Sequence, residues 1–597
     1  MKRNPGMNFA AIAVFLAAVG CGFALHASYP GYLNYDSTDQ LGQALTGRFH
    51  DWHPPFMALL WSLLLKAFPG PLGMIVFDNL LIWGALAVLA VGLRRSLGRW
   101  ALLLVAVPLL PGAFNFLGHV HKDALLVALL LGAISTAYLS KQNGISERLR
   151  WLFWFLAHLC IVAAFLTRLN AIFALVPLLL YANARFERRW NVALCVAMLI
   201  LMPLFSKTQS MFLGVEGRSP ADSIKTYNLL ALSYFSGQNQ FPGEWSPENS
   251  RQIVESCYTP VQWDVASHAG HPCGFIVREL RQQELWGSPA LTRAWLGAIV
   301  RNPLGYFRVL CATFKVSVFD PNSRPMLYQA TNPWGWGVAE DPARRTTLLA
   351  RWYVTTSLYD ALGRPWFFAL LSAGGIALLF TFRAVRTEAG HLSLAVLSSG
   401  LIYLLTYFAF NVSAEYRYFY WSGYAAYIGL IVAVLTARGM RRDSRQEDME
   451  NGGERVIRFS ALGIASLALV LVFVPYGLPT EHRKVTVTPL DSNPIVLMGI
   501  HNTATPKWMG RVFEGRVDAA NWSKLGNGYQ ATRADTSLRA ELDMLHQSIE
   551  VVLGSGPGLG QVLVEEGGFS RVVDTSATRR GILTIIIPPS PNRAVIR

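Results

Sequence analysis

Long stretches without a charged residue recur along this chain, and they constrain its fold more than any other feature. A membrane-spanning helix needs about 20 predominantly apolar residues, and residues 9–27 and 71–93 are two of the stretches that provide them. Only 15% of the 597 residues are charged, whereas a soluble domain has about a quarter. The sequence therefore predicts a mainly α, polytopic membrane protein.

Basic residues predict how the spans are oriented. The net charge is +15, but Lys and Arg gather in short clusters between apolar stretches, which indicates membrane topology and not a nucleic-acid surface. We therefore expect the lipid bilayer, and no nucleic acid, as a partner. The basic N-terminus is predicted to be cytosolic, before a first span at 9–27. Residues 54–68 are short and contain Lys66, so we predict an outer interfacial helix there, which keeps the basic cluster at 94–99 inside.

About eleven spans follow from this arrangement, with every strong basic cluster on the cytosolic side of a bacterial inner membrane. After the first, they are predicted at about 71–93, 100–118, 123–140, 151–167, 170–183, 190–206, 366–382, 391–410, 417–437 and 459–477. Residues 295–319 are nearly apolar enough to cross, but Arg301, Pro303, Arg308 and Lys315 interrupt them. We predict an interfacial or partly embedded helix for that segment.

Composition also predicts the domain organisation. We expect a transmembrane catalytic domain over 1–440 with periplasmic loops at 29–70 and 207–365, a cytoplasmic linker over 441–458, a last transmembrane helix over 459–477 and a periplasmic domain over 478–597. Short apolar runs separated by Gly and Pro predict a β-rich fold for the last domain, with one helix near 538–546.

Two of the six cysteines lie in a polar loop. Cys257 and Cys273 fall in a segment that the topology places outside the cytosol, where disulfides persist. The alternative is a metal site shared with His268 and His271, but the spacing matches no zinc pattern. The sequence therefore favours a disulfide between Cys257 and Cys273.

The first of four polar clusters at predicted outer ends of spans contains Asp36 and Asp39. Charged groups at the membrane edge are costly and are retained for a reason. The two carboxylates are three residues apart and can share one helical face. One can act as a general base, or both can help to bind a divalent cation. The structural alternative is an N-cap made by Ser37, Thr38 or Asp39.

The other clusters supply histidines and cations. They are His50-Asp51-Trp52-His53 before two prolines, His119-Val120-His121-Lys122-Asp123, and Glu415-Tyr416-Arg417-Tyr418, while Arg168 lies at a further outer junction. Lys122 can neutralise a phosphate, and Arg417 can bind one through two parallel hydrogen bonds. The structural alternatives are a solvated turn, a Lys122–Asp123 pair and an aromatic belt. All four clusters fall on one side of the membrane, which favours a common active site.

These motifs resemble those of the GT-C membrane glycosyltransferases. The features that carry the resemblance are an acidic motif soon after the first span, the His53-Pro54-Pro55 helix start, an Asp that opens a later span, and the Glu415-x-Arg417-Tyr418 junction. The group that the chain resembles most is the protein-mannosyltransferase and aminoarabinose-transferase-like family (family 39-like), over roughly residues 1–440. The resemblance implies a GT-C-like fold, a periplasmic juxtamembrane helix from His53, and a polyprenyl-phosphate sugar as the donor. Some relatives hold glycan with a C-terminal β domain, so the resemblance also implies glycan binding by residues 478–597.

The resemblance also implies roles for individual residues. Asp36 matches the catalytic base or acceptor-orienting residue, with Asp39 as the second candidate, and Asp123 matches the second acidic residue. The candidates for binding donor phosphate or substrate are Lys122, His53, His121, Arg168, Glu415 and Arg417. A divalent cation, Mg or Mn, is an optional cofactor with Asp36 and Asp123 as its candidate ligands.

The implied reaction is a displacement at the anomeric carbon. A hydroxyl of a cell-envelope glycan, lipid or protein attacks with inversion, and nearby cations stabilise the charge that builds up on the departing phosphate. Two alternatives stay open. A lipid-linked glycan polymerase would use the same chemistry, and a transporter or flippase of envelope glycolipids would place its charges near the bilayer midplane.

Overall fold

The computed structural model describes residues 5–319 except 111 and 269–270, residues 360–443, positions 463 and 466, and most of 481–587. The gaps in the last range are 503–515, 520–521, 526–527, 532, 535, 545–548, 567–568 and 579–580. The chain forms two units. Unit 1 comprises Met1–Pro220, Ser317–Phe410 and Glu415–Val474, and unit 2 comprises Ala221–Val316, Asn411–Ala414 and Pro475–Arg597.

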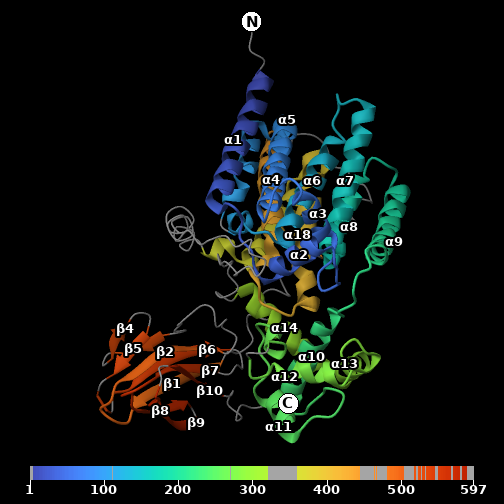
Figure 1. Cartoon of the computed structure of the whole chain (residues 1–597). Coiled ribbons are helices and arrows are strands. Elements are labelled where there is room, and N and C mark those ends of the chain that lie inside the picture. Colours follow the sequence, from blue (N-terminus) through green and yellow to red (C-terminus); the bar gives the residue numbers. More distant parts are fainter. Residues whose placement is uncertain are drawn as a thin grey trace. The chain divides into compact units, whose positions relative to one another are not determined.

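Unit 1 is a bundle of apolar helices (Figure 1). Among the described residues, seven helices are long and apolar enough to cross a membrane. They include α1 Pro5–Ser28, α4 Leu72–Gly92, α6 Lys122–Leu139, α7 Glu147–Thr167, α9 Arg188–Phe212, α18 Glu388–Phe410 and, together with the 3-10 helix η10 Tyr416–Phe419, α19 Tyr420–Asp443. The chain is thus a multi-pass, mainly helical membrane protein, as predicted.

The predicted count of about eleven spans is not confirmed. Two predicted spans are shorter apolar helices, α8 Ile172–Ala182 and α17 Pro365–Thr381. At 1.5 Å per residue, the 11 residues of α8 cover well under the ~30 Å of a hydrocarbon core. The predicted last span at 459–477 lies outside the described residues, apart from two isolated positions.

Helix α6 is the centre of the bundle. It packs against α4 and α7, while α18 packs against α8, α17 and α19. In the most apolar stretch of α6, 83% of the residues are buried. In the corresponding stretch of α9, only 11% of the residues are buried. Because α6 is surrounded by other helices, the polar residues at its N-terminus are held in the interior of the unit.

One predicted span is wrong in its conformation. Residues 100–118 do not form a straight α-helix; the chain there follows α5 Arg94–Leu97 and the 3-10 helices η1 Gly98–Leu104, η2 Val107–Leu109 and η3 Phe114–Phe116. Pro108 cannot continue an α-helix, and Gly112 has a φ of +80°, which favours glycine.

This irregular segment is stabilised by its surroundings. Non-helical backbone is tolerated at membrane depth only where protein buries it, and Leu104 and Val107 are fully buried. The Ala113 carbonyl accepts hydrogen bonds from the hydroxyls of Tyr420 (2.6 Å) and Tyr424 (3.3 Å) of α19. The segment therefore depends on a helix that lies some three hundred residues later in the chain.

Among the described residues, the two segments predicted not to cross contain no candidate span. Residues 54–68 form α3 Phe56–Leu64, a helix of only 9 residues. Residues 295–319 are divided between α13 Pro289–Arg301 and α14 Pro303–Phe319, and neither is among the candidate spans. Pro303 causes the division, because a proline disfavours helical backbone at the residue before it.

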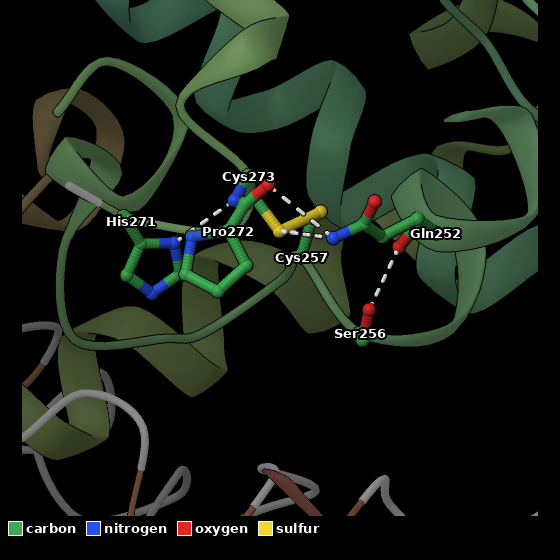
Figure 2. The surroundings of a disulfide bond; sticks show 6 residues. All are labelled: Gln252, Ser256, Cys257, His271, Pro272 and Cys273. Atoms are coloured by element: carbon green, nitrogen blue, oxygen red, sulfur yellow. Dashed lines mark hydrogen bonds between the residues drawn. A yellow bond between two sulfur atoms is a disulfide. The ribbon is translucent and has the colours of Figure 1, made fainter. Parts of the chain in front are cut away.

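Unit 2 contains a set of short helices followed by strands. Its helices besides α13 and α14 are α10 Ala221–Ser236, α11 Pro247–Glu255, η5 Trp263–Ala266 and α12 Phe275–Gln282. A disulfide joins Cys257 and Cys273, as predicted, and links the ends of α11 and α12 (Figure 2). The backbone N–H of Cys273 donates to His271 Nδ1 at 3.2 Å, so His271 supports the bridge.

Loss of this disulfide should destabilise unit 2. The bridge closes a loop with a sequence separation of 16 residues, for which the chain-entropy model gives about 3 kcal/mol. We expect Cys257→Ser to lower the melting temperature of the purified protein, measured by intrinsic fluorescence. Cys160→Ser is the control, since Cys160 is a free cysteine, and an equal effect of both variants would contradict the prediction.

The C-terminal strands form two antiparallel five-stranded sheets. In the order β3-β6-β1-β8-β9, one sheet contains β3 Arg516–Asp518, β6 Leu538–Met544, β1 Glu481–Pro489, β8 Gln561–Glu566 and β9 Phe569–Asp574. In the order β10-β7-β2-β5-β4, the other contains β10 Gly581–Ile587, β7 Ile549–Ser555, β2 Ile495–Asn502, β5 Gly528–Ala531 and β4 Ser523–Leu525. Apolar residues of both sheets share one core, so the predicted β-rich domain is a sandwich.

The helix predicted near residues 538–546 is wrong, because this segment contains strand β6. Leu538, Ala540 and Leu542 are buried in the sandwich core and alternate with Arg539 and Glu541. That alternation has the period of a strand, although Leu, Ala, Arg and Glu all favour helices. Burial between two sheets outweighed intrinsic propensity here.

Candidate active site

The predicted site residues meet at one end of unit 1. Helices α1 and α7 end there, whereas α6 and α19 begin there, so residues from distant parts of the chain come together. We call the group the charged cluster, and its members are Asp36, Asp39, His50, His53, His121, Lys122, Asp123, Arg168, Glu415 and Arg417. Hydrogen bonds and ion pairs connect all of them.

Helix α2 Tyr35–Thr46 presents the two aspartates of the cluster. Its N-cap is Asn34, whose side chain accepts a hydrogen bond from the Ser37 backbone N–H at 2.8 Å. The alternative prediction that Ser37, Thr38 or Asp39 caps this helix is therefore wrong. Since the cap is made by Asn34, the carboxylates of Asp36 and Asp39 are available for other contacts.

Asp36 lies at the centre of the charged cluster. Its Oδ2 is 2.6 Å from Arg417 Nη1, 3.6 Å from His121 Nε2 and 3.9 Å from Lys122 Nζ. Its Oδ1 is 3.8 Å from His53 Nε2. Burial alone would raise the pKa of Asp36, but Arg417, His53, His121 and Lys122 together outweigh burial and hold that pKa well below 3.8. Asp36 is therefore ionised, and a poor proton acceptor while Arg417 is paired with it.

His53 lies in the loop before α3 and contacts both Asp36 and Lys122. Burial, reinforced by the charge of Lys122, lowers the pKa of His53 well below 6.5. The ring is thus neutral at physiological pH, and its Nδ1 accepts a hydrogen bond from Lys122 Nζ at 2.9 Å. The neutral His53 ring leaves the positive charge of Lys122 available to an anion.

Asp39 has different partners. Its carboxylate accepts a hydrogen bond from Gln43 Nε2 at 2.9 Å and contacts His50 Nε2 at 3.1 Å and His53 Nε2 at 4.0 Å. None of these side chains is a lysine or an arginine. Gln43 was not predicted from the sequence, although it follows Asp39 by four residues and therefore shares a helical face with it.

Asp123 and Arg168 form a closed pair. Arg168 Nε and Nη2 lie 2.6 and 2.9 Å from the two carboxylate oxygens of Asp123, and Arg168 Nη1 donates to the Tyr407 hydroxyl at 2.8 Å. The side chains are 9% and 1% exposed. Two-point contacts of this kind fix geometry strongly. Tyr407 could not be predicted, since it lies within an apolar span.

The closed pair orients a histidine toward the centre of the cluster. His121 Nδ1 lies 2.8 Å from Asp123 Oδ2 and accepts a hydrogen bond from the Asp123 backbone N–H at 3.3 Å, and its Nε2 is in close contact with Arg417 Nη1. Asp123 thus holds one nitrogen of the His121 ring, while the other nitrogen faces the centre of the cluster. Arg168 and Asp123 thus position His121, and through it Arg417.

The predicted metal site is not formed by this arrangement. Arg168 occupies both oxygens of Asp123, and Arg417 occupies Asp36 Oδ2. Among the described residues, no group of three or more His, Cys, Asp or Glu side chains is arranged to hold a metal ion. The residues present therefore do not fit a divalent cation in this state, and we derive no step from one.

Basic residues gather at the opposite ends of the same helices. Lys141, after α6, pairs with Glu388 at the start of α18 (3.3 Å). Arg185, after α8, pairs with Glu147 at the start of α7 (2.8 Å). Arg94, after α4, lies over the ring of Phe9 in α1. The charged cluster and these basic residues thus mark two ends of one bundle.

Comparison with known proteins gives little further information. No protein-family model and no curated protein matches the chain. Two solved structures of an oligosaccharyltransferase from Archaeoglobus fulgidus are similar to it. One, in complex with an inhibitory peptide and a dolichol-phosphate, is 15% identical with a TM-score of 0.31 over 78% of this chain. The apo form is 13% identical with a TM-score of 0.32 over 79%.

The chain covers only 55% and 56% of the two solved chains. TM-scores near 0.3 carry no argument about fold or activity, so the function must be inferred from the charged cluster.

Proposed function

We propose that this protein is a membrane glycosyltransferase that moves a sugar from a polyprenyl-phosphate donor to a hydroxyl group. The observation that carries the proposal is the charged cluster, in which two reachable cations, Arg417 and Lys122, adjoin the carboxylate of Asp36. The two cations can bind the phosphate of a lipid donor, and a carboxylate can take up the proton of an acceptor hydroxyl. The motif resemblance to GT-C enzymes points to the same pair of substrates.

In the proposed reaction, the acceptor oxygen forms a bond to the anomeric carbon while the bond from that carbon to the phosphate oxygen breaks. The phosphate leaves with the electron pair, and the hydroxyl proton passes to Asp36. Arg417 and Lys122 stabilise the charge that develops on the leaving phosphate. A single displacement inverts the configuration at the anomeric carbon.

The position of the charged cluster favours an enzyme over a transporter. A transporter would use charged groups near the bilayer midplane, whereas Asp36, Lys122 and Arg417 lie at helix ends. The proposed acceptor is a hydroxyl of a cell-envelope glycan, lipid or protein. A lipid-linked glycan polymerase would have the same arrangement with a lipid-linked acceptor.

We propose further that the cluster faces the periplasm from the inner membrane. The opposite ends of α4, α6 and α8 are followed by Arg94, Lys141 and Arg185, and the positive-inside rule assigns such ends to the cytosol. The disulfide in unit 2 belongs to an oxidising compartment. The N-terminus would then be cytosolic and the β-sandwich periplasmic.

This orientation predicts which positions a membrane-impermeant maleimide can reach in intact spheroplasts. Arg48→Cys, an exposed position near the cluster, should be labelled without permeabilisation. Asn143→Cys, an exposed position between α6 and α7, should be labelled only after permeabilisation. The wild-type chain gives the background from its own cysteines. Labelling of both positions from the same side would contradict the proposed topology and the site built on it.

The proposed function is tested by compositional glycan analysis of cells that lack the protein. We expect one envelope glycan modification to disappear and to return with the wild-type chain. An unchanged glycan composition, with normal protein levels in the complemented strain, would argue against the transferase.

A further inference from the structure

The three cations of the charged cluster differ in how a ligand can reach them. Arg168 is closed off, because Asp123 holds it by two contacts and both side chains are almost fully buried. Arg417 and Lys122 are 12% and 15% exposed. A phosphate that enters the cluster can therefore meet Arg417 and Lys122, but not Arg168.

The two reachable cations already share a counter-ion. Asp36 Oδ2 lies 2.6 Å from Arg417 Nη1 and 3.9 Å from Lys122 Nζ. Glu415 is also in close contact with Arg417, through Nε. Phosphate oxygens would need the N–H groups that these carboxylates occupy. An incoming phosphate and the Asp36 carboxylate, both negative, compete for the same donors.

Asp36 and Glu415 are the more accessible members of these ion pairs. Their side chains are 22% and 39% exposed, whereas Arg417 is also in contact with His121, a 1% exposed side chain that Asp123 holds in turn. The guanidinium is thus kept in place while its carboxylate partners face solvent. Such an arrangement allows an anion to replace a carboxylate without moving the cation.

We propose that Asp36 is a displaceable counter-ion of the phosphate site, so that the phosphate of a lipid donor replaces the Asp36 carboxylate at Arg417 and Lys122. This inference rests on the proposed function and assigns the order of events within it. With phosphate bound, Asp36 loses its strongest partner and becomes able to accept a proton. The donor must therefore bind before the acceptor hydroxyl can be deprotonated.

Removing the competing charge should strengthen phosphate binding. Two unit charges about 6 Å apart repel by ~3 kcal/mol at an effective dielectric constant of about 20, which corresponds to ~100-fold in affinity. Partial screening at the exposed side of the cluster reduces this value. For Asp36→Asn we expect a gain of about tenfold or more.

The experiment uses the purified full-length protein in detergent and polyprenyl phosphate, which is the leaving group for any sugar. The matching polyprenyl alcohol measures lipid binding without the phosphate. We expect Asp36→Asn and Glu415→Gln to bind polyprenyl phosphate more tightly than the wild type, with unchanged affinity for the alcohol. Asp39→Asn is the matched control, since it neutralises a carboxylate of the same helix that contacts neither cation, and it should change the affinity less than about threefold.

The outcomes separate this inference from the proposed function. If the wild type binds the phosphate no better than the alcohol, the proposed donor is wrong. If the wild type prefers the phosphate but Asp36→Asn binds it no more tightly, the displacement is wrong while the donor class stands. If Asp36→Asn does not run as a single species in size-exclusion chromatography, Glu415→Gln takes its place. The displacement is then wrong if Glu415→Gln binds polyprenyl phosphate no more tightly than the wild type does.

Discussion

Cells that carry Asp36→Asn in place of the wild-type chain are expected to lose the glycan modification almost completely. A positioned general base contributes about 10²- to 10⁴-fold to the rate, and asparagine cannot take up the proton of the acceptor hydroxyl. The variant retains the size of Asp36 and one acceptor oxygen, and the N-cap is made by Asn34, so α2 should be unaffected. The measurement is compositional glycan analysis at equal protein level, checked by immunoblotting.

Two further variants show whether the loss is specific. Glu147→Gln changes an acid at the opposite end of the bundle, where it pairs with Arg150 and Arg185, and it should keep full activity. Asp39→Asn tests the second candidate for the base. Full activity of Asp36→Asn combined with complete loss in Asp39→Asn would transfer the base assignment to Asp39.

Asp123→Ala is expected to cause the largest loss of stability of any single change in the charged cluster. Removing the carboxylate leaves the Arg168 guanidinium buried without its two-point partner, and breaking a buried ion pair in this way costs about 3–5 kcal/mol. The melting temperature of the purified protein in detergent should fall accordingly. Activity should fall as well, because His121 loses the partner that orients it.

A double variant distinguishes the unpaired charge from a general intolerance of the position. Asp123→Leu combined with Arg168→Met removes both charges and replaces them with apolar groups, a change that is often neutral or stabilising. We expect the double variant to melt well above Asp123→Ala while remaining inactive. Equal melting temperatures of the two would show that the ion pair is not the reason for the destabilisation.

Much of the architecture could be predicted because membrane proteins follow simple composition rules. Apolar stretches gave most of the long helices, and neither 54–68, which contains Lys66, nor 295–319, which contains Pro303, holds a candidate span. The segment at 100–118 was misread because hydropathy measures whether a segment is apolar, not whether it is helical. Its conformation is decided by Pro108, by Gly112 and by contacts with α19, which no local window contains.

The charged cluster could be predicted as a group but not in its pairings. Membrane topology requires Asp36, Asp123 and Arg417 to lie at the same end of the bundle, and the structure brings them together. Sequence could not reveal that Arg168 is closed off by Asp123 whereas Arg417 stays reachable, because this depends on side-chain packing between α6, α7 and α18. The same packing explains why Tyr407 was missed.

The irregular segment between α4 and α6 also has a consequence for biogenesis. Its Ala113 carbonyl is satisfied by Tyr420 and Tyr424, which leave the ribosome about three hundred residues after it. Until α19 has been inserted, this stretch lacks the two hydroxyls that satisfy the Ala113 carbonyl away from water. Nascent chains that end before α19 should therefore be recognised by membrane quality-control proteases, and the active site can be completed only after nearly the whole transmembrane region has been synthesised.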